Sequence, residues 1–477
     1  MSDVAQTSSR KKLFAIVAIV IIIGASGAVA GWWIITHPPG PPPPQGISLK
    51  IITRHDTAIW NVFRDSFLAS DLAADANVVA LDFVAPLAPQ WQDVILNPAG
   101  QPDVAWGGGP TLFDELISAG LLTKMNGTYM EDVIARVPDE IAGADMKRND
   151  TDGDILWCAA AISSFGFTVN NQTWAAKSLP WPEAWENLTS PDFYHPTATI
   201  AMGNAPATTS NTRIYEIIAQ KFGWDLGWDT LVWMGGNSKI YGGSVQTQTA
   251  VETGEVAVGM TIDFYGYTSM YKYSFCQYVV PQNGSIVNGD PIAIPITCQH
   301  REAAEAFIDF VLSPEGQSQW LRTTINRMPV MEEAFDTPIG ETRDDLYAFY
   351  NSTIENIGIP FDDNLVLSYE WSFIHYFESV ITNAHSALRS AWGKLVNWYL
   401  VDPVGRQAQF DTWAAQLGET VTVTDPYTLT AEKFTEAYAQ SINMLIRGDD
   451  VFRESIKSLW TSAAIAQYNA VEIAVPG

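Results

Sequence analysis

Strand patterns alternate with helix patterns from residue 48 onward, and this alternation constrains the fold more than any other feature of the sequence. Residues 48–53 (SLKIIT) have the pattern of a strand, residues 57–70 that of an amphipathic helix, and residues 77–84 (NVVALDFV) that of a second strand. A short apolar strand, Asp103–Trp106, precedes a helix that ends at Gly120. Consecutive strand–helix–strand units build a parallel sheet covered by helices. The sequence therefore predicts an α/β fold.

The alternation continues through the middle of the chain and then stops. Residues 198–204, 255–262 and 292–297 have strand patterns and are separated by helical segments. Residues 336–477 have mostly helical patterns, with no internal repeat and no chemical motif. We therefore expect a helical C-terminal region that packs on the α/β body.

The charge of the chain restricts its partners. Among 477 residues, 26 are Lys or Arg and 53 are Asp or Glu, so the formal net charge is −27. Nucleic-acid binding needs a basic surface, and a strongly acidic chain repels polyanions. We therefore expect no nucleic-acid partner. The 3 cysteines are too few for a disulfide framework. Buried thiols are expected, with a single bridge, Cys276–Cys298, as the alternative.

The N-terminus predicts an exported protein. Residues 13–36 carry no charge and would form a helix about 36 Å long, enough to cross a bilayer. Basic residues in the tail 1–12 place that tail in the cytoplasm and the remainder outside the cell. We expect a retained single-pass membrane anchor. A signal peptide cleaved after Ala28–Ala30 is the alternative. The Pro-rich segment 37–46 is a semi-rigid linker.

Three segments carry a resemblance to a known family. They are PDVAWGGGPTLFDELISAGLLTKM (Pro102–Met125), TGEVAVGMTIDFYGY (Thr253–Tyr267) and AEAFIDFVLSPEGQSQW (Ala304–Trp320). With them the chain resembles the extracellular solute-binding proteins of ABC importers, family 1-like, in the branch that includes ferric-iron, thiamine, phosphonate and sugar-phosphate binders. The similarity spans residues 48–335, and the segment with Ser-Pro-Glu-Gly-Gln is the most specific.

The resemblance implies a two-lobed periplasmic-binding-protein-like fold of type II, with a hinge between the lobes. Two crossings would join the lobes, near Ser163–Phe167 and Pro291–Pro295. The expected lobes and terminal region are lobe 1 at 47–160 with its return at 291–335, lobe 2 at 161–290, and a helical C-terminal extension at 336–477. A solute would be trapped between the lobes and delivered to a membrane permease driven by a cytoplasmic ATPase.

Candidate ligand-binding residues follow the predicted strands, because ligands of open α/β sheets bind beyond the carboxyl ends of strands. The glycine triplet runs directly into a helix and suits an anion, with a tight turn as the alternative. Several hydroxyl-bearing residues lie at the start of a second helix near residue 209, and a helix cap needs only one of them. Asp263 and Ser244 suit hydroxyls or an ammonium, with a helix cap as the alternative for Asp263. The full set is His55, Gly107, Gly108, Gly109, Ser164, Thr208, Thr209, Ser210, Ser244, Asp263 and Tyr265.

Metal binding and catalysis are not expected. Within the resemblance, His55 and Tyr265 fall near ligand positions of the ferric binders. Gly266 occupies the position of the second tyrosine, and the triplet Gly107–Gly109 lacks a glutamate. Two of the four iron ligands are therefore missing, and His55 is interpreted as a hydrogen-bonding group. Trp106, Trp181 and Trp233 are candidates for stacking on a sugar or cation.

Sequence motifs of the common enzyme classes do not occur: there is no G-x-S-x-G elbow, no H-E-x-x-H and no Walker loop. We therefore expect no catalytic residue and no cofactor. The expected function is the substrate-binding component of an ABC transporter that captures a small, anion-bearing organic solute. The alternative is an extracellular sensor or a carboxylate-pair glycoside hydrolase ectodomain, which would need two carboxylates in one cleft.

Overall fold

A computed structural model describes residues 46–355 and 358–477. The tail 1–12, the apolar segment 13–36 and the linker 37–45 lie outside the described residues, so the expected anchor is not part of the structure. None of the helices in 46–355 and 358–477 combines the length and the apolar character needed to cross a membrane. All three cysteines are free, and Cys158 and Cys276 are buried. The alternative of a Cys276–Cys298 bridge is therefore not what the structure contains.

Lobe 1 is built around parallel strands whose central positions are fully buried. Ile51 of the first strand pairs with Val104 of the third, and both side chains have 0% exposure. The side chain of Asp56 caps the helix that follows the first strand by accepting the backbone N–H of Ala58. The elements of this lobe are β1 (Ile47–Thr53), α2 (Thr57–Leu68), α3 (Asp71–Asp75), β2 (Val78–Val84), α4 (Trp91–Leu96), β3 (Val104–Trp106), α5 (Pro110–Ser118), β4 (Leu122–Thr123), α6 (Thr128–Ile134), β5 (Glu140–Ile141), β6 (Ala144–Asp145), β7 (Lys147–Asn149), α12 (Arg301–Val311) and α13 (Pro314–Ser318).

Lobe 2 repeats the same arrangement with a second set of parallel strands. Ile200 of the first strand of this lobe pairs with Ser238 of the second strand on one side and with Val258 of the third strand on the other. The first and third strands are short and fully buried, as expected for strands that helices cover on both faces, whereas the second strand lies at the sheet edge and exposes Lys239. The elements are α7 (Asn171–Ala176), β9 (Ile200–Gly203), α8 (Thr209–Phe222), α9 (Trp224–Asn237), β10 (Ser238–Tyr241), α10 (Ser244–Glu252), β11 (Val258–Ile262), α11 (Asp263–Lys272) and β12 (Cys276–Val279).

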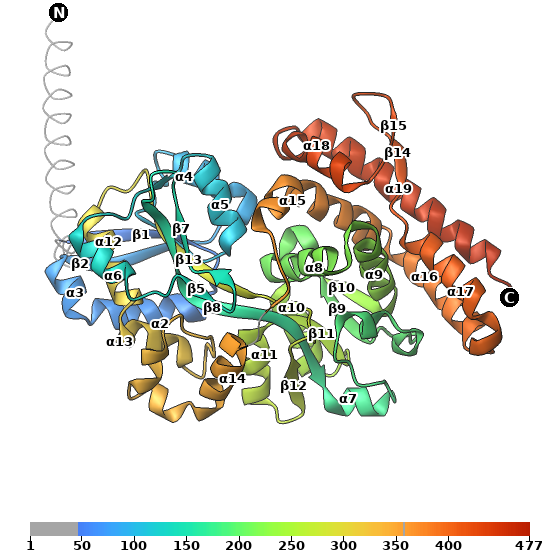
Figure 1. Cartoon of the computed structure of the whole chain (residues 1–477), viewed down its shortest axis with the longest axis horizontal. Helices are drawn as coiled ribbons and strands as arrows, with labels where there is room; N and C mark the ends of the chain where they lie inside the picture. Colours follow the sequence, from blue (N-terminus) through green and yellow to red (C-terminus); the bar gives the residue numbers. More distant parts are fainter. Residues whose placement is uncertain (1–45, 356–357) are drawn as a thin grey trace, which may run out of the picture. The chain divides into compact units, whose positions relative to one another are not determined.

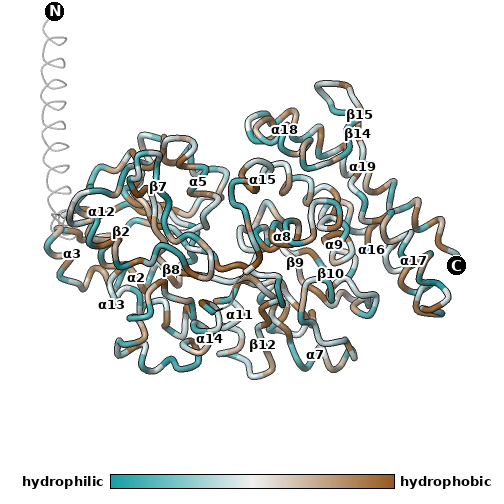
Figure 2. Tube along the Cα trace, viewed as in Figure 1, coloured by the Kyte–Doolittle hydropathy of each residue, from teal (hydrophilic) through white to brown (hydrophobic). Residues whose placement is uncertain are grey.

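Two long strands, β8 (Ile155–Asn170) and β13 (Val287–Pro295), join the two lobes. Up to Ser164, β8 pairs with β13, and from Phe165 onward it pairs with β11 of lobe 2. The predicted first crossing, Ser163–Phe167, contains this change of partner. The predicted second crossing, Pro291–Pro295, lies inside lobe 1 rather than between the lobes. Its residues pair with β3 and β4, because β13 enters the lobe 1 sheet earlier, at Val287. Figure 2 shows the hydrophobic trace of β8 running through the middle of this sheet.

The C-terminal region is helical and shares its hydrophobic core with lobe 2. Trp228 of lobe 2 packs against Phe373 and Tyr376, and Tyr215 stacks on Phe377 with ring centroids 4.3 Å apart. Figure 1 shows α16 and α17 beside α9. The region consists of α14 (Asp344–Glu355), α15 (Asp363–Phe377), α16 (His385–Tyr399), α17 (Pro403–Gly418), α18 (Glu436–Gly448), α19 (Asp450–Ala474) and the hairpin β14 (Thr422–Thr424) with β15 (Ala431–Lys433).

Candidate functional site

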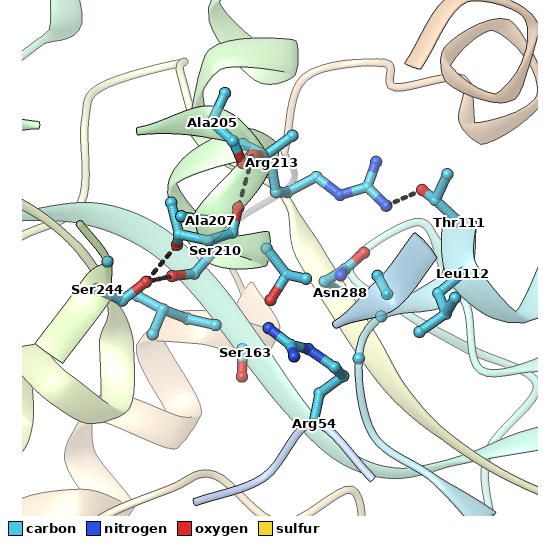
Figure 3. Close-up of a pocket in the computed structure, with 18 of the residues that line it drawn as sticks. Arg54, Thr111, Leu112, Ser163, Ala205, Ala207, Ser210, Arg213, Ser244 and Asn288 are labelled. Atoms are coloured by element: carbon cyan, nitrogen blue, oxygen red, sulfur yellow. Dashed lines mark hydrogen bonds between the residues drawn. The ribbon is translucent and has the colours of Figure 1, made fainter. Parts of the chain in front are cut away.

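A cavity of about 440 Å³ lies between the lobes. Lobe 1 contributes the loops that follow β1 and β3, and lobe 2 contributes the loops that follow β9, β10 and β11. These are carboxyl ends of strands, where open α/β sheets bind ligands. Part of α15, from the C-terminal region, completes the wall through Glu370, Trp371 and Ile374. The cavity therefore joins residues from three parts of the chain, and Figure 3 shows part of its lining.

Three helices begin at the cavity with their amino ends. Lobe 1 presents the start of α5 at Gly109, and lobe 2 presents the starts of α8 at Thr209 and α10 at Ser244. Neither α5 nor α10 has a side-chain cap. The first backbone N–H groups of a helix have no partner inside the helix, and they carry a partial positive charge. Three such ends at one cavity form a surface that favours an anion.

Hydroxyl groups from two of these helices meet at the lobe 2 side of the cavity. The Oγ atoms of Ser210 and Ser244 are 2.6 Å apart, and Thr208 also forms a hydrogen bond with Ser244. Thr208 caps α8 by accepting the backbone N–H of Asn211 at 3.3 Å. Figure 3 shows the hydroxyls of Ser210 and Ser244 bonded to each other on one side of the cavity. A hydroxyl cluster beside free helix ends can donate several hydrogen bonds to one ligand.

Arg54 faces this cluster from lobe 1. Its Nη1 donates to the carbonyl oxygen of Pro86 at 2.9 Å, while its buried Nε has no hydrogen-bond partner among the described residues. Burial lowers the pKa of Arg54, and the nearby Tyr265 opposes that effect. Figure 3 shows the Arg54 side chain reaching into the cavity. The guanidinium therefore retains hydrogen-bonding capacity for an anion.

A buried network of His55, Asp290 and Arg327 forms the base of the cavity. His55 Nε2 lies 2.6 Å and Arg327 Nη1 lies 3.2 Å from Asp290 Oδ2. The backbone N–H of Gly108 donates to Asp290 Oδ1 at 3.2 Å. Burial raises the pKa of Asp290, but the charges of Arg327 and His55 outweigh burial and lower it to about 2. One amide of the glycine triplet is therefore bonded to the protein's own carboxylate.

Gly107 is required at its position by the ring of His55. A Cβ atom there would lie 2.4 Å from His55 Nε2, and the backbone φ of +79° is one that other residues rarely adopt. The imidazole is held in place by edge-on packing against Trp106, with ring centroids 4.4 Å apart. His55 is thus a hydrogen-bonding group, and its partner is Asp290.

Most of the predicted ligand-binding residues line the cavity. They are His55, Gly108, Gly109, Thr208, Thr209, Ser210, Ser244 and Tyr265. Tyr265 lies beside Phe264, and burial raises the pKa of its phenol, which therefore stays neutral. Among the described residues there is no group of three or more His, Cys, Asp or Glu side chains arranged to hold a metal ion.

The other three predicted residues, Gly107, Ser164 and Asp263, are not part of the cavity lining. Asp263 has 0% exposure, and its carboxylate accepts the backbone N–H groups of Ser164 and Phe264, both at 2.7 Å. Burial is the main reason that the pKa of Asp263 rises to about 6. The carboxylate therefore joins α11 to β8. Ser164 belongs to the same contact. Asp263 is not the cap of α11, because Ile262 holds that position and Asp263 is the first residue of the helix.

Several residues that line the cavity were not singled out from the sequence. Arg327 follows the return helix α12 by many residues, and Glu370 and Trp371 lie in the region without a motif. One signal was available: Glu370 is the single acidic residue in the apolar stretch Leu365–Phe377. The three tryptophans proposed for stacking do not line the cavity, since Trp106 is fully buried and the other two pack against the core of lobe 2.

One family model matches more than half of the chain. The family described as bacterial extracellular solute-binding protein matches residues 100–347. A curated relative, the phosphoglycerate transport regulatory protein PgtC of Salmonella typhimurium, is 26% identical over 238 residues. That alignment covers 50% of this chain and 56% of PgtC, so the chain spans about half the length of the curated relatives it matches.

Solved structures show the same fold. The periplasmic binding protein AfuA from Actinobacillus pleuropneumoniae, with exogenous fructose-6-phosphate bound, aligns with a TM-score of 0.51 at 18% identity, covering 65% of this chain and 98% of AfuA. The spermidine/putrescine ABC transporter substrate-binding protein PotD from Streptococcus pneumoniae aligns with a TM-score of 0.51 at 15% identity, covering 69% of this chain and 97% of PotD. These alignments establish the two-lobed α/β fold.

Proposed function

The chain belongs to the family of bacterial extracellular solute-binding proteins, and from this premise we propose that it captures a small, anion-bearing organic solute between its two lobes for an ABC importer. A membrane permease and its cytoplasmic ATPase are the proposed partners. The protein binds and releases its solute without chemical change. We do not favour a sensor or a glycoside hydrolase, because the matching family consists of binding proteins.

The meeting of three helix amino ends at one cavity carries this proposal. The starts of α5, α8 and α10 supply backbone N–H groups, Ser210 and Ser244 supply hydroxyls, and Arg54 supplies a guanidinium. A phosphate or phosphonate group accepts several hydrogen bonds at once and carries the charge that such a surface favours. Two relatives support the same chemistry, because PgtC is named for phosphoglycerate transport and AfuA was solved with fructose-6-phosphate.

We place the two lobes outside the cytoplasm, tethered by the segment 13–36 and separated from the membrane by the linker 37–46. The support comes from the absence of charge in 13–36, the basic residues before it, and the extracellular family. A tethered binding protein stays close to its permease, which raises the effective concentration of loaded protein at the transporter.

Calorimetry with defined anions tests the proposed function. The purified protein is titrated with 3-phosphoglycerate, fructose 6-phosphate, inorganic phosphate and unphosphorylated fructose. The double variant Ser210→Ala/Ser244→Ala removes two hydroxyls that would bond to a charged group. We expect it to weaken binding of the phosphorylated compounds about tenfold or more. The control Ser462→Ala alters an exposed serine of α19 and should leave affinity unchanged.

Two results would contradict the proposal. The first is binding of fructose with no binding of any phosphorylated compound. The second is an unchanged affinity for phosphorylated compounds in the double variant, once circular dichroism shows that it is folded. Mass spectrometry of small molecules released from the purified protein would then identify the class of solute directly.

A further inference from the structure

One end of the cavity is acidic, in contrast to the end formed by the helix starts. Glu216 of α8, Glu370 of α15 and Glu115 of α5 all line this end. A single cavity therefore has one surface that favours negative charge and another that is lined by carboxyl groups. The contrast points to a solute with two groups of opposite charge, provided that the acidic groups are not already neutralised by the protein.

Two of these carboxylates have hydrogen-bonding capacity that the protein does not fill. Glu216 is 2% exposed, and its Oε2 lies 3.3 Å from Arg213 Nη1, but its buried Oε1 has no hydrogen-bond partner among the described residues. Glu370 is half-buried and forms neither a hydrogen bond nor an ion pair within 46–355 and 358–477. Glu115 differs, because it accepts the indole N–H of Trp371 at 2.7 Å and its Oε1 lies 3.6 Å from Arg447 Nη1. Unfilled carboxylate oxygens in a cavity are costly unless a ligand supplies the donors.

The arginines at this end are already paired with other carboxylates: Arg447 with Glu115, and Arg148 with Asp363. Arg213 is shared between Glu216 and Asp363, whose Oδ1 lies 3.0 Å from Arg213 Nη2. No lysine from the described residues lines the cavity. Burial raises the pKa of Glu216 to about 7 and raises that of Glu370 well above its ordinary value. The charges of Glu216, Glu115 and Asp363 raise the pKa of Glu370 further. A cation at this position would relieve that cost.

We propose that the acidic end binds a protonated amine of the solute, so that the natural solute is zwitterionic, with an anionic group and an amine at opposite ends. This inference rests on the proposed function, because the anionic group occupies the helix starts. Along α8, Ser210 and Glu216 are about 9 Å apart in rise. Both side chains lean toward the amino end of the helix, and Glu216 is longer than Ser210, which shortens the gap along the helix axis. A short alkyl chain between the two groups therefore fits.

The C-terminal region is what makes this subsite. Glu370, Trp371 and Ile374 belong to α15, which lies beyond the residues 100–347 that match the family. Trp371 and Ile374 present apolar surface beside the carboxylates, suited to the methylene groups that join an amine to an anion. α15 therefore adds both the charge and the apolar wall, and it sets specificity within the proposed function.

A pair of matched probes tests the amine. 2-Aminoethyl phosphate and propyl phosphate have the same shape, except that a methyl group replaces the ammonium; 4-aminobutyl phosphate and pentyl phosphate form a longer pair. Calorimetry should show that the wild-type protein prefers the amine in at least one pair about tenfold or more. In Glu370→Gln the ratio of the two affinities should fall to near one, because the amine loses its carboxylate partner.

Controls separate this inference from the proposed function. Glu454→Gln changes an exposed glutamate of α19 and should keep the wild-type preference. Equal binding of amine and alkyl phosphates by the wild type overturns the amine subsite and leaves the proposed function intact. A preference for the amine that persists in both Glu370→Gln and Glu216→Gln has the same meaning. Failure of all four phosphates to bind counts against the proposed function and the subsite together.

Discussion

The base of the cavity depends on one buried carboxylate, Asp290, and replacing it by asparagine isolates the contribution of its charge. Asp290 is 5% exposed and lies within hydrogen-bonding or ion-pair distance of His55, Arg327 and the N–H of Gly108. Asparagine has the same shape but no charge. Arg327, which is 4% exposed, would lose its counterion in the variant.

The size of the effect follows from the pKa of Asp290. A fall from the ordinary value of 3.8 to about 2 corresponds to about 2 kcal/mol at neutral pH. Breaking a buried ion pair by removing one partner costs about 3–5 kcal/mol. We therefore expect Asp290→Asn to lower the free energy of unfolding by about 2–4 kcal/mol at pH 7. Because the folded-state pKa is depressed, this contribution is present above pH 3.8 and is lost as the pH falls through about 2.

Urea denaturation followed by circular dichroism measures the difference between wild type and variant. This difference in the free energy of unfolding should fall to about half its pH 7 value near pH 3. Asp65→Asn is the control, because the Asp65 side chain is 71% exposed and its pair with Arg64 lies on the surface. That variant should change stability by less than about 1 kcal/mol. A loss below about 1 kcal/mol for Asp290→Asn at pH 7, or a loss of equal size near pH 3, would refute the reasoning.

Two further substitutions test the surroundings of the cavity. Gly107→Ala should lower the free energy of unfolding by at least about 2 kcal/mol, because its Cβ would lie 2.4 Å from His55 Nε2. Gly120→Ala, with a similar φ of +67° and nothing within 4 Å, should cost only about 1 kcal/mol, and equal losses would contradict the proposed clash. Burial is the main reason that the pKa of Asp263 is raised to about 6. The contribution of this carboxyl group to stability is therefore greatest below pH 3.8 and is lost as the pH rises through about 6. Relative to wild type, Asp263→Asn should therefore gain about 2 kcal/mol between pH 4 and pH 8, and parallel stability profiles would rule this out.

The strands and helices around the cavity could be predicted because their patterns are local. The predicted strand 48–53 corresponds to β1 (Ile47–Thr53), and the helix expected after residue 208 corresponds to α8 (Thr209–Phe222). The periodicity of apolar residues is readable within a few residues, but the expected cap, Ser210 or Asn211, was wrong, because Thr208 caps α8. The rule that ligands lie beyond the carboxyl ends of strands then located the loops of Gly109 and Ser210, which both line the cavity.

Contacts between distant segments could not be predicted in the same way. Asp263 begins α11 beside the cavity, but its carboxylate turns to the N–H of Ser164 on β8. A sequence position cannot distinguish these two directions. Arg327 and Glu370 reach the cavity from segments far along the chain, and only the folded structure places them there. The helical pattern of residues 336–477 was recognisable, whereas the contribution of α15 to the cavity was not.

The position of α15 has a consequence for how the lobes separate. Its core packing belongs to lobe 2, through contacts such as Phe373 with Trp228, yet Trp371 donates to Glu115 of lobe 1 at 2.7 Å. Any separation of the lobes must break that bond or detach α15 from lobe 2. An amine bound at Glu370 would hold the same helix against the cavity. Solute and bridge would therefore favour the same arrangement of the lobes, so that release of the solute requires both contacts to be lost.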